Sequence, residues 1–264
     1  METVWPRRMG WLALLLGLLV ALVLFAPARW LAGAVTGMTD GRLQLLNARG
    51  SLWDGQADVV LTGGSGSQTS ATLPQGIRWR LRPAWEEGSP ALRLALQAPC
   101  CTADPLLLSL RGGISSLSLH LAASRSHWPA DLLAGLGTPW NTLRLEGRLQ
   151  LQTDGFAARW NQGRLGLQGG IGLDAFDLSS RLSPLRPLGS YRLELRAASD
   201  GHTGSLSLST LSGALQLRGE GQWVGSRLRF EGVAEAEQGR EMALTNLLNI
   251  IGRRDGTRSL LRLG

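Results

Sequence analysis

Apolar and polar residues alternate with a period of two along most of this chain, and this pattern restricts the possible folds more than any other feature. The clearest examples are Thr142–Gln152 (TLRLEGRLQLQ) and Gly213–Trp223 (GALQLRGEGQW). Successive side chains of a β-strand point to opposite faces of a sheet, so these segments predict strands with one buried face and one solvated face. Leucine dominates the first face, and Arg, Ser, Gln and Glu dominate the second.

The chain organisation predicts an antiparallel meander. Turns of Gly, Asp-Gly and Asn-Gln-Gly join the alternating segments, as hairpins require, and no long helix separates them as in a parallel sheet. We expect a loop over 62–70 and a short helix over 129–136. Further strands are expected at residues 42–48, 57–61, 77–82, 91–97, 116–121, 156–160, 164–173, 191–196, 205–209, 227–236 and 260–263. The fold class is therefore mainly β.

Three glycines lie on the leucine face of their strands, at Gly147, Gly219 and Gly221. Glycine weakens a strand and marks a bend, a bulge or a close approach of another group. We therefore expect a strongly curved sheet, either an open barrel or a folded-over, taco-like sheet.

Near the end of the chain the apolar period changes from two to that of an α-helix, at Leu244, Leu247, Leu248 and Ile251. This spacing predicts a short amphipathic helix over Glu241–Ile251. Gly252 suits the C′ position, and the arginines that follow suit the negative end of the helix dipole. We expect the apolar stripe of this helix to pack against the open side of the sheet.

An uncharged apolar run, Met9–Ala26, follows Arg7 and Arg8. Its length is close to the minimum for crossing a bilayer, and the preceding arginines favour a cytoplasmic N-terminus. We therefore expect a cytoplasmic tail (1–8), a transmembrane anchor (9–28) and a periplasmic β-domain (29–264) at the inner membrane. A cleaved signal peptide is the alternative, because Ala26-Pro27-Ala28 resembles a cleavage site.

The net charge of +7 comes from arginine alone, since the chain has no lysine. The arginines are spread singly along the strands, and the nearest approach to a stripe is Arg78, Arg80 and Arg82. Nucleic-acid binding needs a basic cluster with interleaved aromatic residues, so we expect none. The charge is explained by solubility, with attraction to anionic lipid headgroups as a weaker alternative.

No residue pattern indicates an active site, a metal site or a cofactor. The histidines, His120, His127 and His202, are far apart, and metal-binding, phosphate-binding and nucleophile-elbow motifs are missing from the sequence. Cys100 and Cys101 are adjacent, so they cannot join distant segments. They can form a vicinal disulfide, pair with a partner or remain thiols. We expect a protein that is not an enzyme.

Three ordered motifs carry a family resemblance. The first is Gly50–Ala57 (GSLWDGQA), and the second is Pro184–Tyr191 (PLRPLGSY). The third runs over Leu208–Trp223 and ends in Leu247–Arg254 (LLNIIGRR). In this order the motifs resemble protein N of the bacterial type II secretion system, the general secretion pathway protein N family. The resemblance covers nearly the whole chain, including the short N-terminal tail and the apolar run.

This resemblance implies a non-enzymatic component of the export machinery, anchored in the inner membrane by one helix. It implies association with the inner-membrane platform and leaves contact with the outer-membrane secretin open. We interpret the motif residues as mainly structural. They are Gly50, Leu52, Trp53, Gly55, Pro184, Leu188, Gly189, Tyr191, Gly213, Leu215, Gly219, Gly221, Trp223, Leu247, Leu248, Ile250 and Gly252.

Two other interpretations fit the alternation. An AsmA-like periplasmic groove for lipids or other hydrophobes would show a deep apolar trough left open by the helix Glu241–Ile251, and a filled interior would oppose it. An outer-membrane barrel would show aromatic girdles and no helical anchor, so the apolar run and the scarcity of Tyr and Phe argue against it. For a secretion component, the open edges of the sheet offer strand addition as a docking mode.

Overall fold

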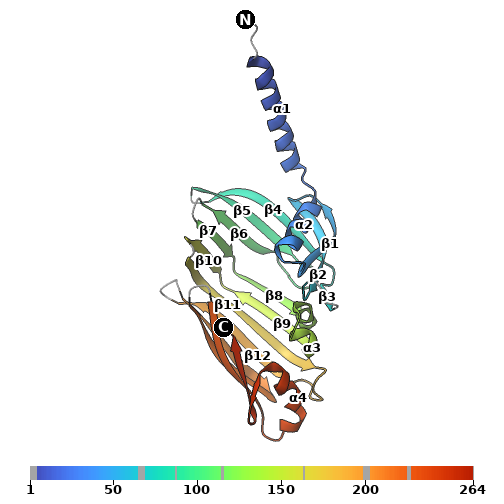
Figure 1. The fold of residues 1–264 in the computed structure, drawn as a ribbon, viewed down its shortest axis with the longest axis vertical. Helices are drawn as coiled ribbons and strands as arrows, with labels where there is room; N and C mark the ends of the chain where they lie inside the picture. The colour runs from blue at the N-terminus through green and yellow to red at the C-terminus, as the bar shows by residue number, and fades with distance from the viewer. Residues whose placement is uncertain are drawn as a thin grey trace.

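A single large antiparallel sheet of 17 strands forms most of the protein (Figure 1). The computed structural model describes residues 5–64, 69–86, 88–113, 116–162, 164–198, 203–224 and 227–263. His202 and Gly163 lie outside these residues, as does part of the loop expected over 62–70. The prediction of a mainly β, antiparallel fold with short helices is confirmed.

The helices are α1 (Trp5–Leu24), α2 (Ala28–Met38), the 3₁₀-helix η1 (Ala130–Leu136), α3 (Trp140–Leu143) and α4 (Glu241–Ile251). The first strands are β1 (Leu43–Gly50), β2 (Asp54–Thr62), β3 (Ser70–Thr72), β4 (Ile77–Glu86), β5 (Ser89–Gln97), β6 (Leu106–Gly112), β7 (Ser116–Leu121), β8 (Ser124–Pro129) and β9 (Leu145–Thr153). They are followed by β10 (Phe156–Asn161), β11 (Arg164–Ser180), β12 (Gly189–Ala197), β13 (Gly204–Gly213), β14 (Leu215–Val224), β15 (Arg227–Ala236), β16 (Arg253–Asp255) and β17 (Arg258–Leu263).

The order of the strands in space follows their order in the chain, because most strands pair with the next one along the sequence. β7 and β8 lie along one line of the sheet, as do β10 and β9, since β7 pairs with β10 and β8 pairs with β9. The 17-residue β11 pairs with both β10 and β9. At the far end, β17 lies between β15 and β16. The result is one continuous meander from β1 to β17.

The sheet is open and is not strongly curled, so the expected barrel or taco shape is wrong. The expectation rested partly on Gly219 and Gly221, and these glycines have a different role. β14 pairs with β15 in one unbroken register through both positions. A Cβ at Gly219 would meet the ring of Phe230, and one at Gly221 would lie 3.1 Å from the same ring. These glycines make room for an aromatic ring, and they do not bend the sheet. Gly147 does lie beside a register shift between β9 and β11.

Two local expectations at the helices also need correction. Gly252 follows α4 with an extended backbone (φ −165°), so it is not a left-handed C′ residue. A Cβ there would lie 2.6 Å from the carbonyl oxygen of Leu260, which means that the close approach of β17 requires glycine. Thr142, expected to begin a strand, lies in α3 instead, and the strand begins at Leu145.

The segment expected as an anchor over 9–28 contains most of α1 and the connection that follows it, and its role as an anchor stays a prediction. α1 ends at Leu24, and Pro27 precedes a second helix, α2, that the alternation did not predict. Pro27 fits this position because its backbone (φ −74°) is extended and no amide N–H is needed there. Within the described part of the chain, no helix has both the length and the hydropathy that crossing a membrane requires.

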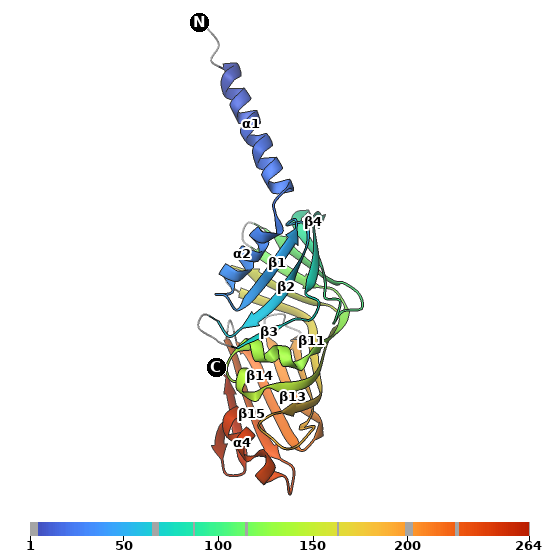
Figure 2. The same ribbon diagram turned by 90° about the vertical axis from the view of Figure 1, so that its right-hand side faces the viewer.

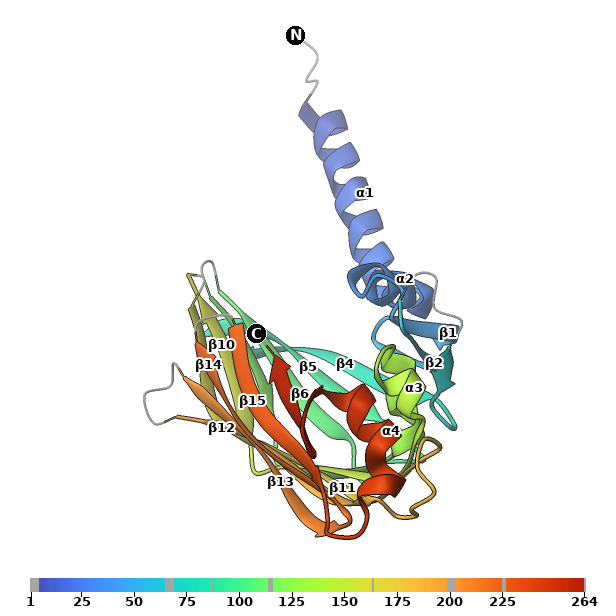
Figure 3. The ribbon, with the colours of Figure 1, turned by 60° about the horizontal axis from the view of Figure 1, so that its bottom comes forward.

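Apart from α1, which projects away from the sheet, the helices cover one end of its apolar face, on the side opposite the hairpin turns of β10, β12 and β14 (Figures 1 and 3). Two hydrophobic clusters result. One gathers α4, η1 and α3 over the later strands, around Leu244, Leu247 and Leu248. The other gathers α2 over β1, β2 and β4, around Trp79 and Leu81. Trp128 contacts both clusters, so the apolar interior is continuous.

Replacing Leu247 by alanine tests whether α4 packs as described. Leu247 is fully buried in the cluster, whereas Met242 of the same helix is exposed. We expect Leu247→Ala to lower the free energy of unfolding by about 2–5 kcal/mol. Met242→Ala should change it by less than about 0.5 kcal/mol. Urea unfolding followed by tryptophan fluorescence measures both, and equal effects would contradict the packing of α4.

Candidate interaction surface

The first motif fastens α1 to the sheet. The turn between β1 and β2 places Trp53 beside the end of α1, where its indole Nε1–H donates to the carbonyl oxygen of Val23 at 2.8 Å. The backbone N–H of Leu52 donates to the carbonyl oxygen of Ala26 at 2.7 Å. The last carbonyls of a helix have no partner within the helix, so the indole supplies a donor at the end of α1, and Leu52 binds the segment that directly follows the helix. We call Leu52 and Trp53, with their bonds to α1, the clasp.

The same turn is held by the next strand on its other side. The indole of Trp79 on β4 donates to the carbonyl oxygen of Leu52 at 3.0 Å, and the N–H of Leu81 donates to that of Trp53 at 2.7 Å. Gly50 has a positive φ of 89°, and a Cβ there would lie 2.5 Å from the carbonyl oxygen of Asp54. The sequence GSLWDG thus forms a tight turn that fixes where α1 leaves the domain (Figure 2).

The second and third motifs meet in the cluster under α4. The buried members that share this cluster are Leu188, Tyr191, Leu215, Leu247 and Leu248. The backbone also joins the two motifs, because the N–H of Leu215 donates to the carbonyl oxygen of Leu188 at 3.1 Å. The first motif lies in the other cluster, among the early strands. The structure therefore brings two of the three motifs together.

The remaining motif residues are spread around these clusters. Pro184 and Ile250 are exposed, and Trp223 is half-buried where β14 pairs with β15. Gly213 has a positive φ of 121°, and a Cβ there would overlap the backbone of Gly189. The assignment of the motif residues as structural stays a prediction, which the variants below test.

A row of large apolar side chains stays uncovered at the hairpin ends of the sheet. Its members are Trp85 (73% exposed), Leu110 (39%), Leu117 (43%) and Trp160 (42%). Each lies within two residues of a strand end. The register places Trp160 opposite Leu117 and puts Leu110 in line with the buried apolar face. We call these four side chains the hairpin-end surface.

Sequence reasoning missed the hairpin-end surface. Alternation assigns a residue to a face of the sheet, but it does not say whether another element covers that face. A usable signal was present in the positions of two residues. Trp85 and Trp160 both lie directly before polar turn sequences, Glu-Glu-Gly and Asn-Gln-Gly. A tryptophan so close to a turn lies near the edge of the covered area.

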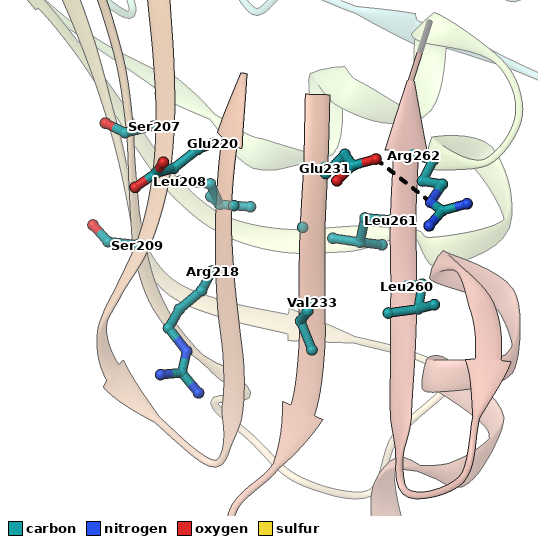
Figure 4. A pocket seen from close by; sticks show the side chains of 12 residues that line it. Ser207, Leu208, Ser209, Arg218, Glu220, Glu231, Val233, Leu260, Leu261 and Arg262 are labelled. Carbon is teal, nitrogen blue, oxygen red and sulfur yellow. Dashed lines mark ion pairs between the residues drawn. The ribbon is translucent and has the colours of Figure 1, made fainter. Parts of the chain in front are cut away.

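A hollow of about 570 Å³ lies along β13, β14, β15 and β17 (Figure 4). Glu220 and Glu231 lie directly opposite each other on neighbouring strands, and Arg262 pairs with Glu231 at 3.8 Å. Figure 4 shows these side chains at the hollow together with Ser207 and Ser209. This ion pair is exposed and weak. The lining is mixed and partly charged, and is unlike an enclosed apolar trough.

The apolar stripe of α4 is packed against the sheet, and a hollow of about 370 Å³ lies at the C-terminal end of the helix, along β17. Leu244, Leu247 and Leu248 are completely buried against the sheet. This packing agrees with the expectation that the stripe of the helix covers the sheet. It opposes a deep apolar trough at that place, which was the observation expected for a lipid-binding groove.

The residues considered for chemistry are not gathered into one site. His127 bonds Gln150 at 3.1 Å, and His120 lies on a different strand, exposed. Among the described residues, no group of three or more His, Cys, Asp or Glu side chains could hold a metal ion. Cys100 and Cys101 form a vicinal disulfide, which selects one of the three possibilities left open by the sequence. It occupies the turn between β5 and β6, where Cys101 accepts a backbone hydrogen bond from His127.

The buried Tyr191 gives the protein a defined response to alkaline pH. Burial raises the pKa of the Tyr191 phenol above its ordinary value, and its hydroxyl donates to the carbonyl oxygen of Leu215 at 3.0 Å. The stability linked to this group is complete below the unfolded-state pKa of about 10 and is lost as pH rises toward the folded-state pKa. We expect a loss of about 1.4 kcal/mol per pH unit above about pH 10.

Urea unfolding at pH values from about 9 to about 11, which bracket the ordinary phenol pKa of about 10, measures this loss of stability. The chain has one tyrosine and no lysine, so few other groups titrate in this range. Tyr191→Phe is the control and should remove the slope. An equally steep slope in this variant would show that another group is responsible.

Replacing Gly219 by alanine tests whether the third motif has a structural role. Alanine there would drive a methyl group into the ring of Phe230, whereas Gly112, also in a strand, has open space at the same place. We expect Gly219→Ala to lower the free energy of unfolding by about 1–3 kcal/mol. Gly112→Ala should stay within about 0.5 kcal/mol of the parent. Indistinguishable midpoints of urea unfolding would rule out the packing role of Gly219.

Comparison with known proteins agrees with the resemblance seen in the motifs. The family model of type II secretion system protein N matches residues 41–260, which is well over half of the chain. No curated protein and no solved structure matches the chain significantly. The matched span includes the turn of the clasp, the cluster under α4 and the hairpin-end surface. The chain therefore belongs to the type II secretion system protein N family, and it is a component of that secretion system in the bacterial cell envelope.

Proposed function

We propose that this protein is a non-enzymatic component, anchored in the inner membrane, that contributes to the assembly or stability of the type II secretion machinery from the periplasm. The family match over residues 41–260 is the observation that carries this proposal. Family membership implies other secretion components as partners. The inner-membrane platform is the first candidate, and the outer-membrane secretin is the second.

The surroundings of α1 support membrane anchoring. Its large apolar side chains from Trp11 to Leu24 are 45–66% exposed, so the sheet does not cover them. From Met9 onward α1 is uncharged and apolar on every side, and such a helix segment is expected in an apolar environment rather than in water. The apolar run Met9–Ala26 continues this character along the sequence.

The clasp supports a retained anchor over a cleaved signal peptide. Ala26 and Ala28, which flank the candidate cleavage site, are both buried. Pro27 forms a β-bridge with Ser51, and the carbonyl oxygen of Ala26 accepts the N–H of Leu52. Cleavage there would separate α1 from the turn that completes its C-terminal end.

The sheet edges are less suited to strand addition than the sequence suggested. β1, at one edge, changes register between Leu46 and Arg49, and such a bulge interrupts pairing. β16, at the other edge, has only three residues, Arg253–Asp255, all charged. Short, charged edge strands discourage pairing with another chain. The faces and hairpin ends are therefore the better candidates for contact with other components.

The proposal is tested with the full chain extracted from membranes. Its intact mass should include residues 1–28, because the anchor is retained. Crosslinking in whole cells should recover components of the inner-membrane platform, and deletion of the gene should reduce secretion of cargo across the outer membrane. Normal secretion after deletion, together with no crosslink to any secretion component, would overturn the proposal.

A lipid- or hydrophobe-binding role is the second candidate, and the uncovered hairpin-end surface is the observation in its favour. The buried apolar stripe of α4 argues against lipid binding, because it closes that part of the apolar face. Native mass spectrometry of the full chain distinguishes the two functions. A retained lipid of defined mass would favour lipid binding, and its absence from a chain that crosslinks to the platform would exclude it.

A further inference from the structure

The four side chains of the hairpin-end surface belong to three hairpins on the same side of the sheet. Trp85 belongs to the hairpin β4–β5, Leu110 and Leu117 to β6–β7, and Trp160 to β10–β11. Corresponding positions on the later hairpins are half-buried, for example Leu195 on β12–β13. At the end of the sheet where these three turns lie, the described large apolar groups are thus more exposed on the early hairpins than on the late ones.

The early part of the meander is also the part next to α1. Figures 1 and 2 both place β4 and its turn into β5 at the end of the domain from which α1 emerges. Phe25, at the end of α1, and Trp30, on α2, are exposed at the same end. Because the clasp fixes the exit of α1, these aromatic groups and Trp85 have a set position relative to that helix.

Cationic groups accompany the apolar ones. Arg82 is exposed on β4 opposite Arg93, and Arg164 is exposed at the start of β11, beside the turn that follows Trp160; alternation places both arginines on the other face of the sheet from the tryptophans. Among the described residues, neither guanidinium forms an ion pair, whereas Arg93 on β5 pairs with Glu86 at 2.6 Å. Tryptophan rings favour the boundary between hydrocarbon and water, and arginine favours anionic headgroups. Together these side chains suit the surface of a bilayer.

We propose that the hairpin-end surface, with Arg82 and Arg164, is a second membrane contact, through which the domain rests on the bilayer that holds α1. This inference rests on the proposed anchoring by α1. The occupant is a lipid surface because the β4–β5 end of the sheet lies where α1 emerges, and exposed tryptophan side chains favour the boundary between hydrocarbon and water. The contact holds the long sheet at a fixed angle to the membrane.

Fluorescent probes on the full chain, reconstituted in vesicles of zwitterionic and anionic phospholipid, test the contact. Both native cysteines are in the disulfide, so an introduced cysteine is the single free thiol. Ser116→Cys, at the start of β7, reports on the hairpin-end surface, and Ser205→Cys, near the start of β13, is the matched control. Both serines are exposed. A polarity-sensitive label at residue 116 should shift to shorter wavelength and be quenched by lipids with a shallow spin label.

The control label at residue 205 should show neither change. In the double variant Trp85→Ser and Trp160→Ser, the label at residue 116 should lose its shift. Both tryptophans are exposed, so the fold should survive. A label at Leu15→Cys in α1, quenched by deep spin labels, reports on anchoring separately. Quenching at residue 15 without quenching at 116 overturns this inference alone. A response at 116 that appears only after secretion components are added also overturns it, since the surface then binds protein.

Discussion

The requirement that one apolar face of an open sheet be covered governs the architecture. A closed barrel would bury this face within itself, but a 17-stranded open meander leaves its coverage to other elements. Here α2, η1 with α3, and α4 cover the ends of the strands away from the hairpin turns. Each fully buried leucine, such as Leu244 or Leu248, contributes about 1.5–3 kcal/mol, so this coverage decides stability. Among the described residues, no helix covers the other end of the face.

The clasp satisfies a second requirement, which is that the end of α1 finds hydrogen-bond donors. Carbonyl groups at the end of α1 need donors, and the turn between β1 and β2 supplies an indole N–H and a backbone N–H. The turn also accepts bonds from β4, so the exit of α1 is tied to three strands at once. A flexible connection would leave the sheet free to rotate. This connection instead makes the direction of α1 a property of the sheet.

Strand positions and the bounds of α4 could be predicted because they depend on local periodicity, as at Leu244 and Leu247. The curvature could not, because a strand glycine such as Gly219 serves equally for a bend or for a facing ring, and only the position of Phe230 decides. The helix α2 escaped prediction because its apolar residues follow the long run directly and share its composition. Trp85 and Trp160 show the general limit: periodicity gives the face, but coverage depends on elements distant in sequence.

Because the strand order follows the chain order, position in the sequence translates into distance from α1. The strands near α1 carry the clasp and the hairpin-end surface, whereas the strands far from it carry the second and third motifs and the cover of α4. Contacts that fix the orientation of the sheet relative to a membrane are effective only near the anchor. Under the proposed membrane contact, the cluster around Tyr191 and Leu247 then keeps the distal strands in a fixed relation to the oriented end, because the meander is one continuous sheet.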